Sequence, residues 1–437
     1  MVALLVAVFC GAAGAMAQIT ALGKQIYDLT GRELDLGWLG LAEFAPAALL
    51  VLVTGVVADR RDRRRVAAAA LAAQAAVALA LAAYAGSDPT SAAPFFALVF
   101  LFGIGRAFAA PSSRALPADV VGPERLPTVV ARFSAAWQAA VVVGPVVGGV
   151  LLTLDPHLPY LACAALFVVA ALATLAVRLV PRHAAAAGPV PLADAVPGGS
   201  ELRPAGDPIT LGATPVRAGL HEAVEGLRFI RRVPVLLGAI SLDLFAVLFG
   251  GAIALLPAIA TDRLGVDAVG LGWLRAAGGL GAGAVTLVLA VRPLRRRVGA
   301  SLLAGVAVFG LGTIVLGLTR SFPVAFAAMV VLSGADAVSV FVRATLVPLV
   351  TPEDTRGRVM AVEHVFIGAS NELGAFESGV AGQLLGPTGA VVLGGSAAVA
   401  LAAGWAVLFP ALRRVDRFPG LAGPDGRPAA VAPAPTP

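Results

Sequence analysis

The stretch Leu36-Gly37-Trp38-Leu39 decides the fold, because it returns later in the chain as Leu271-Gly272-Trp273-Leu274. Two more groups return in the same order. The first, Arg63-Arg64-Arg65-Val66, returns as Arg295-Arg296-Arg297-Val298. The second, Gly105, Arg114-Ala115, Val121 and Pro123-Glu124, returns as Gly334, Arg343-Ala344, Val350 and Pro352-Glu353. The three offsets are 235, 232 and 229 residues. Three markers that keep their order and nearly keep their spacing predict a duplicated unit, roughly residues 1–180 and 234–410.

The composition predicts a membrane protein. Of the 437 residues, 59% are hydrophobic and 13% are charged, whereas average soluble domains carry about 25% charged residues. A soluble chain of this length could not bury so much apolar surface, so lipid must solvate much of it. Internal repeats in such sequence are typical of secondary transporters. The net charge of +6 would suggest nucleic acid in a soluble protein; here we attribute it to charge sorting across a bilayer and expect no nucleic-acid partner.

Twelve apolar stretches are long enough to cross a bilayer, since a spanning helix needs about 20 residues. Backbone polar groups in lipid must be satisfied within the segment, which excludes open sheets. The sequence therefore predicts an all-α integral membrane protein. Its helices are expected at about 2–23, 37–58, 66–86, 94–116, 128–153, 159–180, 234–260, 268–291, 299–319, 322–346, 359–385 and 388–410.

Arginine and lysine are divided unevenly between the two sets of turns. One set carries 22 of them and the opposite set carries four. The positive-inside rule then places both termini and the 181–233 linker in the cytoplasm of a multi-pass protein of the cell membrane. The richer set comprises the turns at 59–65, 117–127, 181–233, 292–298 and 347–358 and the tail after 410.

These features divide the chain into four regions. They are an N-terminal six-helix bundle at 1–180, a linker at 181–233, a C-terminal six-helix bundle at 234–412 and a disordered tail at 413–437. Residues 217–233 combine helically spaced apolar residues with arginines, as in an amphipathic helix at the membrane surface. Residues 2–17 also fit a signal peptide, but the repeat requires a first membrane helix there. The lack of a hydrophilic leader leaves open a start upstream of Met1.

The turn GVVADRRDRRRV, which begins at Gly55, joins the second and third predicted helices. Gly55 allows two helices to approach closely. Asp59 lies at the membrane edge, where a carboxylate needs a positive partner or a helix N-terminus. The basic residues Arg60, Arg63 and Arg64 hold the turn on the cytoplasmic side. A plain basic loop would explain the arginines but not Gly55 and Asp59, so we take these five residues as a candidate gating loop.

The fifth predicted helix contains GPVVGG, residues 144–149. Pro145 removes one backbone hydrogen bond and bends a membrane helix. Gly144, Gly148 and Gly149 allow close helix contact. The alternative to a functional bend is simple packing glycine in a chain rich in Ala and Gly.

Charged residues inside the predicted helices are candidates for function, because a lone Arg in the bilayer costs about 2.5–3.5 kcal/mol. Carboxyl groups in a low-dielectric cavity can bind and release protons near neutral pH. Helical spacing puts Glu363, Ser370 and Glu377 on one stripe and points Glu372 the other way. The alternative for each acid is a neutral or paired structural group. The acidic candidates for proton coupling are Asp336, Glu377, Glu363, Glu43 and Asp243, and Arg106 must face a wet cavity or a carboxylate.

These motifs resemble those of the major facilitator superfamily over about residues 1–412. The turn from Gly55 is similar to the loop signature G-x-x-x-D-R-x-G-R-R, with Asp62 in place of the second Gly. GPVVGG resembles the G-P-x-x-G-G element of exporting antiporters, with Ala140 where a Gly is usual. Together with Arg106 and its surroundings, these motifs give the chain its likeness to the drug and siderophore exporter branch, which includes the enterobactin exporter and macrolide efflux proteins. The family has an Arg linked to proton coupling at this point of the fourth helix, so the resemblance adds Arg106 to the proton-coupling candidates.

The resemblance implies two six-helix bundles around a central cavity, with Gln18, Ser113 and Arg343 as candidates for lining it. It also implies alternating access, and efflux of a small amphipathic molecule, drug-like or siderophore-like, coupled to protons. Uptake or facilitated diffusion of a small solute is the alternative. We expect a monomer in the bilayer. The sequence determines neither the substrate nor the stoichiometry.

Enzymatic chemistry has no support in the sequence. We find no phosphate-binding loop that would bind ATP. The four His and two Cys are scattered and give no metal-ligand spacing. We therefore expect no enzyme activity, no cofactor and no metal, and a membrane receptor or enzyme on a carrier scaffold remains the remote alternative.

Overall fold

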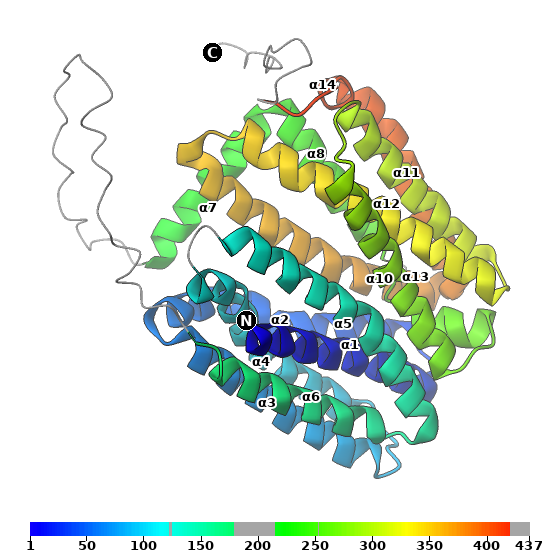
Figure 1. Ribbon diagram of the computed structural model, residues 1–437. Coiled ribbons are helices and arrows are strands. Elements are labelled where there is room, and N and C mark those ends of the chain that lie inside the picture. Colours follow the sequence, from blue (N-terminus) through cyan, green and yellow to red (C-terminus); the bar gives the residue numbers. More distant parts are fainter. Residues whose placement is uncertain (122–124, 179–214, 252, 420–437) are drawn as a thin grey trace.

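The computed structural model describes residues 1–121, 125–178, 215–251 and 253–419, with residues 51–53, 55, 56, 58–60, 215–223 and 354 described by their backbone alone. The described chain forms a bundle of long helices (Figure 1). These are α1 (Val2–Thr30), α2 (Glu33–Arg60), α3 (Arg63–Ala85), α4 (Ala93–Val120), α5 (Leu126–Leu154), α6 (Leu158–Leu175), α7 (Pro215–Arg232), α8 (Pro234–Phe249), α9 (Leu256–Ala258), the π-helical turn η4 (Ile259–Arg263), α10 (Ala268–Val291), α11 (Val298–Leu318), α12 (Phe322–Val350), α13 (Glu353–Leu408) and α14 (Pro410–Arg413).

The all-α membrane prediction is confirmed. Nine helices in the described part of the chain are long and apolar enough to cross a bilayer, or ten if the bent pair α7–α8 is one span. The 56-residue α13 is two helices joined at Gly386, whose backbone has φ 73° and ψ 161°. Only glycine adopts such a conformation readily. The predicted helices at 359–385 and 388–410 therefore lie on the two sides of this kink.

The prediction of one unbroken helix at 234–260 is wrong. α8 ends at Phe249, and the chain resumes helical structure only at α9 and η4. Gly250 closes α8 by donating its backbone N–H to the carbonyl of Ala246 at 2.8 Å. Two successive glycines weaken a helix, and Pro257 enters at the start of the next one, where proline is tolerated. The apolar composition of this stretch concealed the break.

The prediction of a disordered tail from residue 413 does not hold for residues 413–419. Phe418 is buried in a hydrophobic core cluster with residues of α8, α11 and α12. The backbone N–H of Gly299 donates to the carbonyl of Val415 at 2.9 Å. The predicted amphipathic helix is present as α7. The predicted Pro-rich linker before it and the rest of the tail lie outside the described residues.

Helices α1–α6 pack on one another, and so do α8–α14 (Figure 1). The two groups, here called the N-half and the C-half, meet mainly along α5 with α10 and along α2 with α13. The duplicated LGWL sequence lies at these crossings. Gly37 on α2 faces the backbone of Phe376 on α13, and Gly272 on α10 faces the backbone of Pro145 on α5. Because a side chain at either glycine would meet backbone atoms, the repeat preserves close helix contact.

The two halves are joined from the middle of the bundle toward one end. This far end carries the turns 31–32, 155–157 and 264–267, and the basic end carries the turns 61–62 and 292–297. In the middle, Gln138 on α5 donates to the carbonyl of Gly279 on α10 at 2.5 Å. A hydrophobic cluster at the far end combines residues of both halves, namely Tyr27, Leu36, Leu255, Ala258, Ile259, Ala390 and Val391.

A hydrogen bond from the Tyr27 hydroxyl to the Asp262 carboxylate crosses between the halves at this far end. We expect Tyr27→Phe to favour separation of the halves here by about 1–2 kcal/mol, because the bond to a charged group is lost. In purified protein carrying Ala258→Cys, this should raise maleimide labelling at position 258 about 5–30-fold.

The matched control is Tyr160→Phe, which removes a hydrogen bond to Gln25 inside the N-half. It should leave labelling at position 258 unchanged. Equal labelling in both variants would show that the Tyr27–Asp262 bond does not hold the far end closed.

Candidate functional site

A buried charge cluster joins three helices of the C-half. Arg343 on α12 contacts Asp243 on α8 at 2.6 Å and Glu363 on α13 at 3.7 Å. The side chains of Arg343, Asp243 and Glu363 are 5%, 7% and 9% exposed. Burial of ionic groups is costly unless they are paired, so the arginine is needed where it stands. Sequence reasoning proposed Arg343 as a cavity residue; in this structure it is the counter-ion of two proton-coupling candidates.

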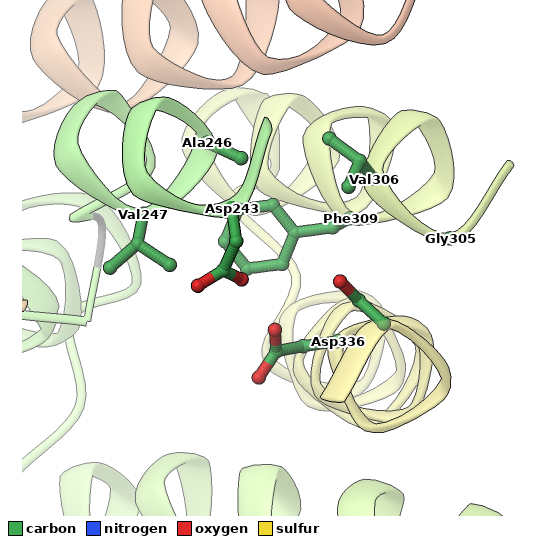
Figure 2. A pocket seen from close by; sticks show the side chains of 8 residues that line it. Asp243, Ala246, Val247, Gly305, Val306, Phe309 and Asp336 are labelled. Carbon is green, nitrogen blue, oxygen red and sulfur yellow. The ribbon is translucent and has the colours of Figure 1, made fainter. Parts of the chain in front are cut away.

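A small cavity adjoins this cluster between α8, α11 and α12, and we call it the α8–α12 chamber. It has room for about one water molecule. The carboxylates of Asp243 and Asp336 point into it from opposite walls (Figure 2). Ser339, one turn along α12 from Asp336, also lines it. The Ser339 hydroxyl oxygen is buried and has no hydrogen-bond partner among the described residues.

A second charged group lies where the halves meet, and we call it the Arg106 group. Arg106 on α4 pairs with Glu43 on α2 within the N-half. Glu372 on α13 interacts electrostatically with both of them. Its carboxylate also lies close to Gly40, one turn from Glu43. The group therefore connects two proton-coupling candidates of the N-half to an acid of the C-half.

Sequence reasoning missed two members of this group. Helical spacing places Glu372 on a different face from Glu363 and Glu377, so it was not among the candidates. That same orientation points Glu372 toward the N-half. Arg275 on α10 follows directly after the second LGWL stretch, and it interacts electrostatically with Glu43. The sequence signal that could have identified Arg275 is an arginine inside an apolar helix.

The remaining candidate positions differ in their surroundings. Gln18 on α1 is completely buried, and neither its amide oxygen nor its amide nitrogen has a partner among the described residues. Ser113 is partly exposed, whereas its neighbour Ser112 is buried with an unpartnered hydroxyl. Glu377 lies on α13 beside Ser378, away from the Arg343 cluster. Orphaned polar groups such as Gln18 mark places where water or a ligand can bind.

Two arginines of the candidate gating loop bind to other parts of the N-half. Arg63 contacts Asp119 at the end of α4 at 3.1 Å, and Arg64 donates to the carbonyl of Val177 at 2.9 Å. Asp62, which stands where the loop signature has Gly, accepts the backbone N–H of Arg64 at 2.9 Å and so caps α3. The side chains of Asp59 and Arg60 and the surroundings of Gly55 lie outside the described residues.

The Asp62 carboxylate that caps α3 is titratable. Partial burial disfavours its charged form, but hydrogen bonds from the Arg64 side chain and backbone outweigh this and lower the pKa of the Asp62 carboxyl below its ordinary value. Its stabilising contribution is therefore present above the ordinary pKa and is lost as the pH falls through the lowered one.

The GPVVGG stretch packs α5 against two other helices. Gly144 and Gly148 face the backbone of Ala13 and Ala17 on α1, and Gly149 faces Ala268 on α10. Pro145 lies within α5, and all four residues of the predicted bend are buried. The contacts are those of packing glycines at a crossing of three helices. They also put the stretch next to the contact between the halves.

Comparisons with known proteins agree with this architecture. The sequence profile of the Major Facilitator Superfamily matches residues 4–362. A search of curated proteins gave no match. Among solved structures, a bacterial homologue of the human lysosomal transporter Spinster, inward-facing and unoccupied, is similar at 16% identity and a TM-score of 0.66, over 94% of this chain and 95% of that one.

Two other solved structures share the fold. The nucleoside transporter NupG is 15% identical with a TM-score of 0.65, over 93% of this chain and 98% of its own. A POT family transporter is 11% identical with a TM-score of 0.66, over 94% and 96% of the two chains. With the family profile covering most of the sequence, the chain belongs to the Major Facilitator Superfamily and is a secondary transporter.

Proposed function

We propose that the protein exports a small amphipathic molecule by alternating access, with protons as the coupling ion. The observation that carries the proposal is the excess of acid in the C-half: Asp243, Glu363 and Asp336 surround the single guanidinium of Arg343. One cation cannot neutralise three carboxylates, of which two are buried and that of Asp336 is partly buried. The cluster therefore has capacity to take up protons and release them as the halves rearrange.

Export is supported by the likeness of GPVVGG to the element of exporting antiporters, and by the place of this stretch beside the contact between α5 and α10. A drug-like or siderophore-like substrate follows from the likeness to that exporter branch. Uptake of a small solute is the second candidate, and the solved structures that share the fold include a nucleoside transporter.

A panel of siderophores, macrolides and cationic dyes, presented to a host that lacks its own exporters, tests the proposal. Cells with the protein should hold less of at least one compound, and an uncoupler should erase the difference by collapsing the proton gradient. Accumulation that rises with expression of the protein would instead favour uptake. A difference that persists with the uncoupler would exclude proton-driven export.

The proposed orientation puts the basic end in the cytoplasm. In a variant without native cysteines, we expect Arg65→Cys, on an exposed side chain at the basic end, to react with an impermeant maleimide only from the cytoplasmic side. Asp88→Cys, in the turn before α4, should react only from outside. Labelling of both positions from the same side would overturn the topology.

A further inference from the structure

The α8–α12 chamber presents oxygen atoms of a kind that suits a hard cation. Asp243 and Asp336 contribute carboxylates, and Ser339 contributes a hydroxyl that is 2% exposed and makes no hydrogen bond among the described residues. A buried hydroxyl without a partner loses the free energy of its hydrogen bonds to water. Ser339 lines the same small space as the two carboxylates, and Figure 2 shows Asp243 and Asp336 pointing into it. This arrangement suits a ligand bound between the three groups.

The charges around the chamber favour a positive occupant. Arg343 engages Asp243 and Glu363 directly, whereas Asp336 forms no ion pair with another described residue and interacts with Arg343 at longer range. The third wall, from α11, contributes Gly305, Val306 and Phe309, which carry no charge. The charged residues that line the chamber are Asp243 and Asp336. With Glu363 beside Arg343, three carboxylates adjoin one guanidinium, so a proton or a cation is needed to balance them.

The break after α8 adds a second electrostatic contribution. Asp243, Ala246 and Val247 line the chamber from the last two turns of α8, which ends at Phe249. The C-terminal end of a helix carries partial negative charge and stabilises cations. Discontinuous membrane helices use such ends to bind Na⁺ or protons in transporters of several folds. The chamber therefore lies near the C-terminal end of α8.

We infer that the α8–α12 chamber binds a single small monovalent cation, Na⁺, between Asp243, Asp336 and Ser339. A divalent ion fits less well. Ca²⁺ takes six to eight oxygen ligands, and Mg²⁺ requires octahedral geometry and usually keeps several waters. The chamber offers three side-chain groups and space for about one sphere of the size of water.

This inference rests on the proposed function for its role in transport, because the same carboxylates would also take up protons. The two ions then compete, so the apparent affinity for Na⁺ falls as the pH is lowered. Binding itself can be measured without any substrate, and it stands or falls separately from proton-driven export.

The test is thermal unfolding of the purified full-length protein in detergent, with NaCl, KCl and choline chloride compared at equal ionic strength. We expect a saturable rise in Tm with Na⁺ alone, because a ligand that binds only the folded state stabilises it. Asp336→Asn should abolish this rise. Ser339→Ala should weaken Na⁺ binding about tenfold while leaving Tm in choline unchanged or higher, since the hydroxyl has no partner to lose.

The matched control is Asp88→Asn, the same change of charge in an exposed turn where the backbone has φ 50°. It should retain the full response to Na⁺. Equal rises with all three salts, or an unaltered Na⁺ response in both Asp336→Asn and Ser339→Ala, would overturn the inference. Proton-driven export without a Na⁺-specific rise in Tm would support the proposed function and exclude the Na⁺ site. A rise in Tm that depends on the chamber residues, without export, would support the Na⁺ site and exclude the proposed function.

Discussion

Replacing Arg343 by methionine is expected to destabilise the protein by about 3–5 kcal/mol, because the carboxylates of Asp243 and Glu363 would remain buried without a cation. Thermal unfolding in detergent measures the effect, together with the yield of monodisperse protein. The triple variant Arg343→Met/Asp243→Asn/Glu363→Gln should regain most of the lost stability, since the two carboxylates in direct contact with Arg343 are then neutral as well.

Arg65→Met provides the control for this prediction. The Arg65 side chain is 83% exposed, and its contact with Asp62 is 3.8 Å long. Surface ion pairs of this kind contribute about 0–1 kcal/mol. If Arg343→Met is as stable as Arg65→Met, or if the triple variant is less stable than the single one, the three side chains do not form the charge cluster that joins α8, α12 and α13.

Replacing Asp336 by asparagine is expected to abolish gradient-driven transport, with a loss of at least about tenfold, while the protein still inserts and folds. Asparagine keeps the shape of the side chain but cannot exchange a proton in the physiological range. Asp336 has no close ion pair among the described residues, so its neutralisation leaves the Arg343–Asp243 contact intact.

Exchange of labelled for unlabelled substrate without a gradient should continue in Asp336→Asn, because it requires the halves to move but no net proton transfer. Asp88→Asn again serves as the control and should transport normally. Normal driven transport in Asp336→Asn would remove Asp336 from the coupling mechanism, and loss of both driven transport and exchange would assign it to substrate binding or to folding.

The fold could be predicted from the sequence because its strongest signals are those that lipid imposes. Long apolar stretches must become helices in a bilayer, and each of the twelve predicted ranges overlaps a helix, although the range 234–260 is broken after Phe249. The LGWL repeat marks where helices of the two halves cross. Gly37 and Gly272 both lie at contacts between the halves, so the repeat recorded the crossing geometry. The break at Gly250 was missed because hydropathy does not distinguish an apolar helix from an apolar unwound segment.

The site was predicted less completely. A charge inside an apolar helix is visible in the sequence, and this identified Arg106, Asp336 and Asp243 as candidates. Which charges meet depends on how helices far apart in the chain pack against each other. The pairing of Arg343 with Asp243, and the turning of Glu372 toward Arg106, follow from that packing. Ser339 could not be singled out, because a buried hydroxyl without a partner is recognised only in three dimensions.

Transport by purified protein in proteoliposomes tests the central claim most directly. Vesicles holding the protein would be given a pH gradient, and the movement of each compound identified by the export panel would be followed with and without that gradient. The account predicts movement against the compound's own gradient when protons flow the opposite way, and its loss in Asp336→Asn. Absence of movement for every compound under any imposed ion gradient would contradict it.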